Sequence, residues 1–459
     1  MKAFVGFLGR ERRRSLWVIL FLALGLLLFR TTAVYATPDD ETVFVLNTFA
    51  FLIWGALVMW MSAGFTMLEA GSVRTKNASM ICLKNIGLYS IAGLAYYLIG
   101  YNLMYVDVQS VIGQFGFLYG PTAEDLALMA GQAESTAAVV AGGYSTLSDW
   151  FFQMVFVATA ASIVSGALAE RVKMWAFFLF VLVLTAIIYP IVGAWTWGGG
   201  WLSALGFQDF AGSTVVHSTG GWAALAGILV VGPRLGRFRR DGSVKPLPPS
   251  NILVVTLGVF ILWFGWLGFN GGSQLALGSA LDAVAMSQVI VNTNLAAAAG
   301  VIAAILVSRP ILGRMDLFAG LNGAIAGLVA ITAGPDIVEP YWAIIIGIIG
   351  AVLCTASIKL LEILKVDDVV GAVPAHLGAG IWGTLATSIA AGANLGVQLI
   401  GVLAVGAFVF VLSWLLWTLL DKLMGARVSR TVEQLGQDVG ELGIEAYPEF
   451  VLMPEDFDE

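Results

Sequence analysis

Charged side chains are scarce in this sequence and make up only 12% of its 459 residues. Soluble domains contain about 25%. A water-facing surface for a chain of this length cannot be built from so few charges, which excludes a soluble globular protein. The spare apolar residues, from a total of 59%, must therefore face lipid. The 54 glycines are typical of membrane helices that pack closely together.

Cysteine and histidine are scarcer still, with two residues of each. Cys82 and Cys354 both lie in apolar segments, so we interpret them as packing residues without a disulfide or metal role. The sequence contains no nucleotide-binding loop, nucleophile triad or metal-ligand spacing. We therefore predict that the protein is not an enzyme, and we predict no cofactor and no nucleic-acid partner.

The first 36 residues are typical of a secretory signal peptide. Arginines at positions 10 and 12–14 precede an apolar run from Leu16 to Phe29, and small residues follow at Val34 and Ala36. This pattern predicts cleavage after Ala36. The alternative is a retained first membrane helix, although the apolar run is short for about 30 Å of hydrocarbon.

Beyond residue 36, eleven apolar segments are long enough to span a membrane. They lie at about 43–71, 84–106, 148–169, 174–197, 212–232, 251–270, 287–308, 314–333, 340–361, 370–391 and 397–421. The sequence therefore predicts an all-α integral membrane protein with 11 transmembrane helices. Residues 37–424 would form the membrane domain, and residues 425–459 would form a cytoplasmic regulatory tail.

The basic residues predict the orientation of these segments. Every Lys and Arg beyond residue 36 falls in, or at the edge of, the loops that follow the odd-numbered segments. The opposite loops contain none, and the long stretch 107–149 is acidic, with Glu124, Asp125 and Glu134. Because basic residues concentrate in cytoplasmic loops, this pattern predicts an external mature N-terminus and a cytoplasmic C-terminus.

One pattern, D-x-x-G-x-x-x-x-H-x-x-x-G, occurs twice, at residues 209–221 and 368–380. Asp209 would lie at the outer end of its helix and Asp368 at the inner end of its own. An inverted-topology repeat requires this reversal. The pattern predicts two inverted five-helix repeats followed by a final helix, with a transport site near the membrane midplane.

His217 and His376 are the only histidines in the chain, and each lies one to two turns inside an apolar helix. Ionisable residues within a membrane normally face the protein interior or a water path. The predicted repeat would bring the two rings together. Two adjacent imidazoles can share one proton, which suits a proton relay or a path for a small hydrogen-bonding solute.

Two other uses of paired histidines are minor alternatives. Axial haem ligation would require more histidines and redox partners, which are not evident. Metal transport would want carboxylates or thiolates at ligand spacing. The residues that flank these histidines are instead Gly, Val, Ala, Pro, Ser and Thr.

Several motifs between about residue 43 and Tyr447 resemble those of the ammonium transporter family (Amt/Mep/Rh). They are AGSVRTKN at 70–77, FQMVF at 152–156, GALAER at 166–171, WGGG at 197–200, DFAGSTVVH at 209–217, GWLGFNGGS at 265–273, the stretch 367–376, and Arg427–Ser429 with Glu441, Glu445 and Tyr447 in the tail. In combination these motifs are very specific. The resemblance implies transport of ammonium or ammonia across the membrane.

The resemblance also implies roles for individual residues. Phe156 and Trp197 would offer aromatic faces to ammonium in an outer vestibule, where Ser273 would accept a hydrogen bond from the cation. Phe152 would lie near a neighbouring subunit's vestibule. Phe156 and Phe269 would stack as a gate across the pore.

Near that gate, ammonium would lose a proton. Ammonia would pass His217 and His376 while the proton moves separately along them. Asp209 would organise the vestibule, and Asp368 would be its structural counterpart on the inner side. The chain departs from many family members at Gly371, where an aspartate is common, and at Leu377, where glycine is frequent.

Family resemblance implies a homotrimer in the lipid bilayer, and the signal-like start favours a bacterial inner membrane. Basic residues of one cytoplasmic loop, with the acidic tail, would suit docking of a trimeric PII-type signal protein; they are Arg234, Arg237, Arg239 and Arg240. Equally, these residues would serve only to orient the chain. An ammonium sensor that acts through a partner protein without conduction is the alternative function.

Overall fold

The computed structural model describes residues 38–448. The predicted signal peptide at residues 1–36 and the last residues of the tail therefore lie outside the described residues. Within the described range the chain forms no strand, and β pairing is limited to the isolated bridges Val172–Arg427 and Phe238–Val244. The predicted all-α class is confirmed for this part of the chain.

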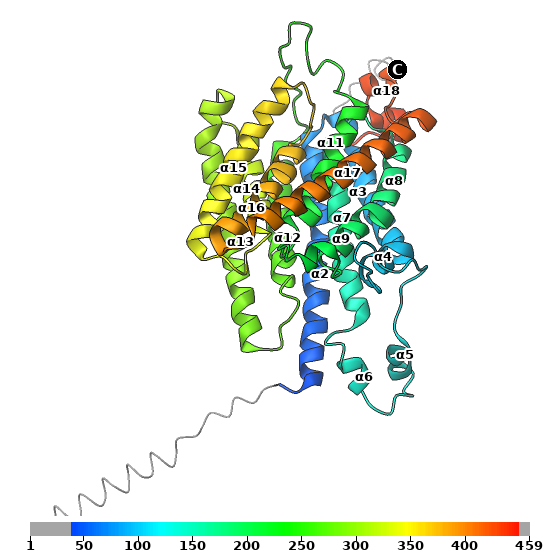
Figure 1. Cartoon of the computed structure of the whole chain (residues 1–459). Helices are drawn as coiled ribbons and strands as arrows, with labels where there is room; N and C mark the ends of the chain where they lie inside the picture. Colours follow the sequence, from blue (N-terminus) through cyan, green and yellow to red (C-terminus); the bar gives the residue numbers. More distant parts are fainter. Residues whose placement is uncertain (1–37, 449–459) are drawn as a thin grey trace, which may run out of the picture. The chain divides into compact units, whose positions relative to one another are not determined.

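Several helices continue through a π-helical turn into the next helix (Figure 1). In chain order the elements are α2 (Asp40–Ser72), η1 (Thr75–Asn77), α3 (Ala78–Ala95), η2 (Tyr96–Gly100), α4 (Tyr101–Tyr105), α5 (Ala123–Met129), α6 (Ala137–Val140), α7 (Thr146–Ala167), α8 (Met174–Val183), η3 (Leu184–Ile188), α9 (Tyr189–Thr196), α10 (Trp201–Ala204), η4 (Ser213–Ser218), α11 (Thr219–Val231), α12 (Ile252–Gly272), α13 (Ala280–Leu312), α14 (Leu317–Ile331), α15 (Pro340–Ile363), η5 (Val373–Gly378), α16 (Ala379–Ala391), α17 (Leu395–Met424), α18 (Arg430–Leu435) and η6 (Asp438–Leu442).

Nine helical runs of residues 38–448 are long and apolar enough to cross a membrane, judged by length and composition. The other two predicted segments are helical as well. The predicted segment 314–333 contains α14, which has 15 residues, and segment 370–391 contains η5 followed directly by α16. A helix of 15 residues is about 23 Å long, which is short for about 30 Å of hydrocarbon. The count of eleven transmembrane helices therefore stays a prediction.

The helices expose large apolar side chains on their outward faces. Leu253 is 77% exposed, Leu306 70% and Leu403 68%. Extended apolar surfaces of this kind are rare on soluble monomers. A hydrocarbon environment accounts for them, because it removes these side chains from water.

Small residues bring the helices close together. A Cβ built on Gly258 of α12 would meet the backbone nitrogen of Leu68 in α2 at 2.4 Å. Similarly, a Cβ built on Gly300 of α13 would come within 2.3 Å of the backbone oxygen of Gly323 in α14. Figure 1 shows α17 crossing the other helices obliquely, and its Trp417 packs against Gly227 of α11. Such contacts are typical of membrane helix interfaces.

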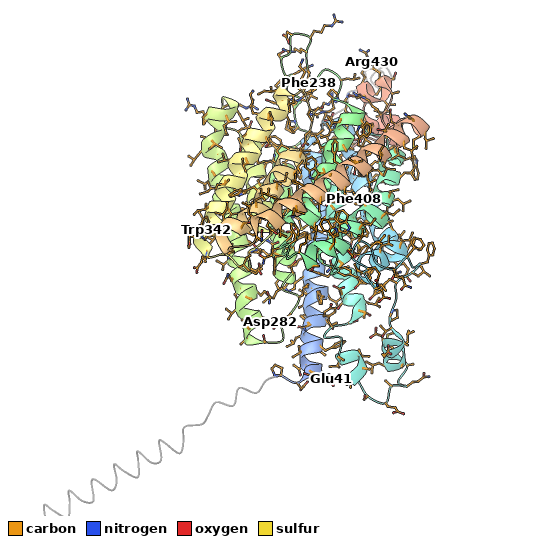
Figure 2. All side chains as sticks on the ribbon, in the orientation of Figure 1. Glu41, Phe238, Asp282, Trp342, Phe408 and Arg430 are labelled. Carbon is orange, nitrogen blue, oxygen red and sulfur yellow. The ribbon has the colours of Figure 1, made fainter. Side chains whose placement is uncertain are left out.

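The two ends of the helical unit differ in the loops they carry. Figure 2 shows Phe238 and Arg430 at one end and Glu41 and Asp282 at the other. The loop around Phe238 contains five basic residues between positions 234 and 245. The loops at the end that carries Asp282 contain acidic residues instead. This separation agrees with the charge sorting seen in the sequence, and the direction of insertion stays a prediction.

Candidate functional site

The two repeated motifs begin with similar carboxylate-capped turns. The Asp209 carboxylate accepts hydrogen bonds from the backbone N–H groups of four successive residues, at 2.8–3.1 Å; they are Gly212, Ser213, Thr214 and Val215. Gly212 has φ of 105°, a conformation that suits glycine. Burial raises the pKa of Asp209 to about 6, although the four N–H donors lower it.

The second motif repeats this arrangement. Asp368 accepts hydrogen bonds from the N–H groups of Gly371 at 3.1 Å and Val373 at 2.7 Å. Gly371 has φ of 78°, again in the left-handed region. Each carboxylate thus satisfies the free donors at the start of a helical run that carries a histidine. This geometry supports the structural roles predicted for Asp209 and Asp368.

The last glycine of each motif lies against the other motif. A Cβ on Gly221 would come within 2.7 Å of the Cβ of Leu377, and one on Gly380 within 2.4 Å of the backbone oxygen of Ser213. The turns η4 and η5 are in direct contact. The glycines therefore allow the two runs to approach closely enough for their histidines to meet.

His217 and His376, the histidine pair, face each other through their Nδ1 atoms, which are 3.3 Å apart. Their ring centroids are 5.3 Å apart and the ring planes differ by 29°. His217 is fully buried and its Nε2 has no hydrogen-bond partner, whereas His376 is 4% exposed. One hydrogen shared between the two Nδ1 atoms leaves the two Nε2 atoms free to exchange a proton with other groups.

Aromatic rings continue the line beyond His217. The rings of Phe156 and Phe269 are stacked with centroids 3.9 Å apart, and the Phe269 centroid is 5.3 Å from that of His217. Trp266 stacks on His217 at 4.8 Å. Its Nε1 donates a hydrogen bond to Oγ1 of Thr332 at 2.8 Å, which holds the indole in place.

Sequence reasoning did not single out Trp266 or Thr332. Trp266 lies within the GWLGFNGGS motif, but it is one of 15 tryptophans and had no other distinguishing feature. Its contact with His217 joins η4 to α12, the helix that follows α11, and arises only in the folded chain.

Trp197 contacts Phe156, and Ser273 contacts the backbone of Phe269. Trp197 is half-buried, meets Phe156 edge-on at 6.1 Å, and donates from Nε1 to the backbone oxygen of Asp209 at 2.8 Å. The Ser273 hydroxyl donates to the backbone oxygen of Phe269 at 2.9 Å, so its lone pairs stay available to another donor. Phe152 is buried and packs 4.8 Å from Phe156 of the same chain. Its predicted place near a neighbouring subunit stays a prediction.

Comparison with known proteins agrees with this geometry. The model of the Ammonium Transporter Family matches residues 49–447. The chain belongs to the ammonium transporter family. It is 40% identical to the ammonium transporter Amt2 of Archaeoglobus fulgidus over 432 residues, covering 87% of this chain and 88% of that protein. It is also 40% identical to a putative ammonium transporter of Synechocystis, covering 89% and 90%.

Solved structures show the same family fold. A protein named Sensor Amt Protein superposes with a TM-score of 0.79 at 37% identity, covering 88% of this chain and 99% of that one. Mep2 of Candida albicans gives a TM-score of 0.73 at 26% identity, covering 86% and 89%. Ammonium transporter family membership thus rests on both sequence and structure.

Gly371 and Leu377 are the two positions at which this chain departs from many family members, and the structure shows what surrounds each of them. Gly371 lines a wide cavity of about 460 Å³ together with Asp368 and Asn322. A Cβ on Gly371 would lie 2.9 Å from Nδ2 of Asn322. Leu377 is buried against Gly221, beside the histidine pair.

A buried ion-pair network lies near the wide cavity. Arg234 is 5% exposed and bonds Asp367 and Glu170 at 2.8 and 2.9 Å. Burial would raise the pKa of Asp367, but the hydrogen bonds and charge of Arg234 hold it well below its usual range. Arg234 is therefore engaged inside the protein, whereas Arg239 and Arg240 of the same loop are exposed.

Among residues 38–448, no group of three or more His, Cys, Asp or Glu side chains is arranged to hold a metal ion. The histidine pair faces aromatic rings and another imidazole, which suits a small hydrogen-bonding solute.

Proposed function

We propose that the protein moves ammonium across a membrane by binding the cation, removing one proton and conducting ammonia past the histidine pair. The proposal rests chiefly on one observation. The Phe156–Phe269 stack adjoins His217, whose ring in turn faces His376 through atoms 3.3 Å apart. These four contacting side chains join an aromatic entrance, formed by Phe156 and Phe269, to a pair of histidines that can carry a proton. The sequence and structural comparisons support the same substrate.

Recognition of ammonium would take place between Trp197, Phe156 and Ser273. The negative face of an aromatic ring attracts a cation by up to about 2 kcal/mol when water is removed. The Ser273 oxygen can accept a hydrogen bond from an ammonium N–H, because its own hydrogen is directed to the Phe269 carbonyl. Phe152 would complete the aromatic surface, either here or toward a neighbouring subunit.

Selectivity would come from deprotonation. A bare cation in a low-dielectric pore faces a solvation penalty of many kcal/mol, whereas neutral ammonia faces far less. Sodium and potassium cannot become neutral by losing a proton. The closely stacked rings of Phe156 and Phe269 would exclude hydrated ions, and ammonia would pass when the rings move apart.

The histidine pair would relay the proton that ammonium loses. His217 Nε2 is a buried nitrogen without a partner, so it is suited to accept the proton. The shared Nδ1 contact would pass a hydrogen to His376, and His376 Nε2 would release one on the other side.

We also propose the finer architecture predicted from the sequence. It comprises a cleaved signal peptide at residues 1–36, eleven spans in two inverted repeats plus a final helix over residues 37–424, an external N-terminus and a cytoplasmic tail from residue 425. The similar carboxylate-capped turns at Asp209 and Asp368 support the repeat. A homotrimer in a bacterial inner membrane follows from the family resemblance and the signal-like start.

A PII-type partner would dock on exposed residues of the cytoplasmic face. Arg239 and Arg240 are accessible for such a contact, whereas Arg234 is committed to buried ion pairs. The partner's role would be to close the exit of the pore. We propose this regulation through the loop and the tail together.

An ammonium sensor without conduction is the second candidate function. The observation that favours it is the superposition on the protein named Sensor Amt Protein, with a TM-score of 0.79. Both functions require ammonium binding, so binding alone does not separate them. Conduction does.

Measurement of the ammonium-evoked current in proteoliposomes tests the proposal. The purified protein is compared with its His217→Ala/His376→Ala variant, and ammonia uptake is recorded alongside. We expect a saturable current that is lost in the variant. Full current in the variant would overturn the relay, uptake without current would indicate neutral ammonia passage, and the absence of both from the parent protein would favour the sensor.

A further inference from the structure

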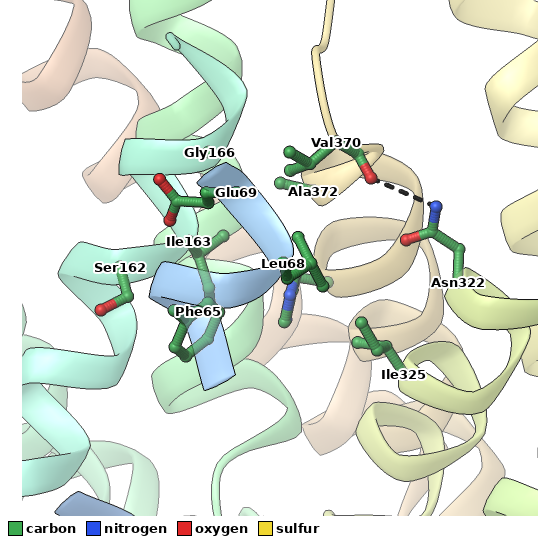
Figure 3. A pocket seen from close by; sticks show the side chains of 11 residues that line it. Phe65, Leu68, Glu69, Ser162, Ile163, Gly166, Asn322, Ile325, Val370 and Ala372 are labelled. Atoms are coloured by element: carbon green, nitrogen blue, oxygen red, sulfur yellow. Dashed lines mark hydrogen bonds between the residues drawn. The ribbon is translucent and has the colours of Figure 1, made fainter. Parts of the chain in front are cut away.

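A small cavity is lined in part by His376. Its polar lining residues are His376, Glu69 of α2, Ser162 of α7 and Asn322 of α14, and the remainder of the lining is apolar. The cavity offers about 20 Å³ to the centres of water molecules. About 10–15 Å³ of such space holds one water. Figure 3 shows Glu69 and Ser162 on one side of this cavity and Asn322 on the other.

Glu69 is a fully buried carboxylic acid in this apolar setting. Its Oε2 accepts hydrogen bonds from Ser165 Oγ at 2.7 Å and Asn85 Nδ2 at 3.3 Å. Its Oε1 is equally buried and has no hydrogen-bond partner. An unsatisfied buried oxygen costs about 1–3 kcal/mol, so this atom has capacity for a proton or a water.

A buried lysine lies close to this carboxyl group. Lys84 of α3 is 1% exposed, and its Nζ donates to the backbone oxygen of the same Ser165 at 3.1 Å. A neighbouring positive charge favours the ionised form of a carboxyl group, whereas burial favours the neutral form. These opposed influences are what a group needs if it is to gain and then lose a proton.

The small cavity also adjoins the wide cavity that contains Asp368 and Gly371. Asn322 and Val370 line both cavities, and Asn322 Nδ2 donates to the Val370 backbone oxygen at 3.2 Å (Figure 3). A single hydrogen-bonded pair therefore separates the two spaces at this point. Glu69 shares the small cavity with His376, and the wide cavity begins beyond Asn322 and Val370 on the opposite side.

We propose that Glu69 is the group that accepts the relayed proton from His376 and hands it to water in the wide cavity. This assignment rests on the proposed function and deepens it by naming the acceptor.

The proton steps balance in this scheme. An ammonium N–H bond breaks with its electron pair left on nitrogen, and His217 Nε2 gains the proton. The shared Nδ1 hydrogen moves to His376, whose Nε2 proton passes through one water to the Glu69 carboxylate. The neutral acid then loses its proton to water of the small cavity, from which it passes beyond Asn322 and Val370 to water in the wide cavity, and the carboxylate is restored.

Two substitutions separate proton transfer from structural support. Glu69→Gln keeps an oxygen that accepts from Ser165 but cannot be ionised. Ser165→Ala removes that hydrogen bond but keeps the carboxylate. Ammonium-evoked current and uptake are measured in proteoliposomes for both variants and the parent, with folding checked by gel filtration and thermal unfolding in detergent.

We expect Glu69→Gln to lower the current by about 100-fold or more, as for other positioned acid–base groups. The ammonium-evoked current of Ser165→Ala should stay within about threefold of that of the parent. A Glu69→Gln variant that conducts like the parent would overturn the assignment while leaving the proposed function intact. Equal losses in both variants would also overturn it, because they would indicate a structural role. A parent that neither conducts nor takes up ammonium would overturn the proposed function and this assignment together.

Infrared spectroscopy first tests the unaltered protein, and a variant serves only to assign the observed band to Glu69. Addition of ammonium should change the carbonyl band of a protonated carboxylic acid, and Glu69→Asp should shift that band. A difference spectrum without a carboxylic acid signal would contradict the proposal.

Discussion

Gly221 of α11 and Leu377 of η5 are in contact across the crossing of the two motifs, where an added Cβ on the glycine would come within 2.7 Å of the leucine Cβ. The backbone nitrogen of Leu377 would be only 2.9 Å away. Leu377 directly follows His376. The position of this histidine is thus coupled to the absence of a side chain at residue 221.

Gly221→Ala should therefore reduce transport. An extra methyl group in a packed core costs about 1–3 kcal/mol and displaces its neighbours, here the backbone next to His376. We expect a large loss of ammonium-evoked current per protein molecule in proteoliposomes. Gly227→Ala is the matched control, because Gly227 lies on the same helix as Gly221 but its added methyl group would crowd Trp417 of α17 instead. Equal losses of current in both variants would contradict a specific effect on the histidine pair.

Phe156→Leu should weaken ammonium binding. Leucine keeps much of the apolar volume but removes the aromatic face that lies between Trp197 and Phe269. A loss of about 1–2 kcal/mol of cation–π attraction corresponds to a rise of about 5- to 30-fold in the half-saturating ammonium concentration. Uptake measured over a range of concentrations gives this value. Phe180→Leu is the control, since Phe180 is also buried but stacks on Trp417; an equal rise there would refute the assignment.

Much of this site could be predicted from the sequence because its signals are local or repeated. The scarcity of charge predicted a membrane protein, and the only two histidines recurred in one spaced pattern. The stack of Phe156 on Phe269 followed from the family resemblance, and the centroids of the two rings lie 3.9 Å apart. Such features depend on composition and motif position, which the sequence carries directly.

Other features depend on contacts between distant segments and could not be read from the sequence. Glu69 belongs to an otherwise ordinary apolar helix, and its relation to His376 arises only when α2 and η5 line one cavity. The burial of Arg234 was missed for a similar reason, because an arginine in a basic loop resembles its exposed neighbours. Its partner Asp367 lies 133 residues away in the sequence.

Asp367→Asn should lower thermal stability at neutral pH. The substitution would remove the negative charge that Arg234 contacts at 2.8 Å in a buried site. Loss of one partner of a buried ion pair costs about 3–5 kcal/mol. Thermal unfolding in detergent measures the change. Asp316→Asn is the control, because its ion-pair partner Arg314 is 73% exposed and such a pair should contribute about 0–1 kcal/mol.

The pH dependence of this difference has a definite sign. Because the pKa of Asp367 is lowered in the folded protein, the unfolded chain binds more protons as the pH falls. The stabilisation is full above the ordinary aspartate pKa of about 3.9 and is lost below it. The gap in melting temperature between the parent and Asp367→Asn should therefore be largest near neutral pH and shrink below about pH 4. A constant gap would contradict the ion-pair explanation.

Asp438 connects the tail to the start of α3. Its carboxylate accepts hydrogen bonds from the backbone N–H groups of Ser79 at 2.9 Å and Met80 at 2.8 Å. Removal of a side chain that satisfies a helix start costs about 0.5–2 kcal/mol, so Asp438→Ala should favour release of the tail. Cleavage by trypsin after the exposed Arg430 should become about 2- to 30-fold faster, because proteolysis follows the population of the open form.

Mass spectrometry of timed digests gives the rate of this cleavage. Glu445→Ala is the control, because it removes an exposed carboxylate from the same tail without changing the cap on α3. Faster cleavage in Asp438→Ala alone would mean that the cap holds the tail against the membrane domain. Equal rates in the parent and Asp438→Ala would mean that other contacts suffice, among them the hydrogen bonds from Lys76 to the backbone oxygens of Glu433 and Gln434. The tail could then act on the pore only by a route that leaves α3 in place.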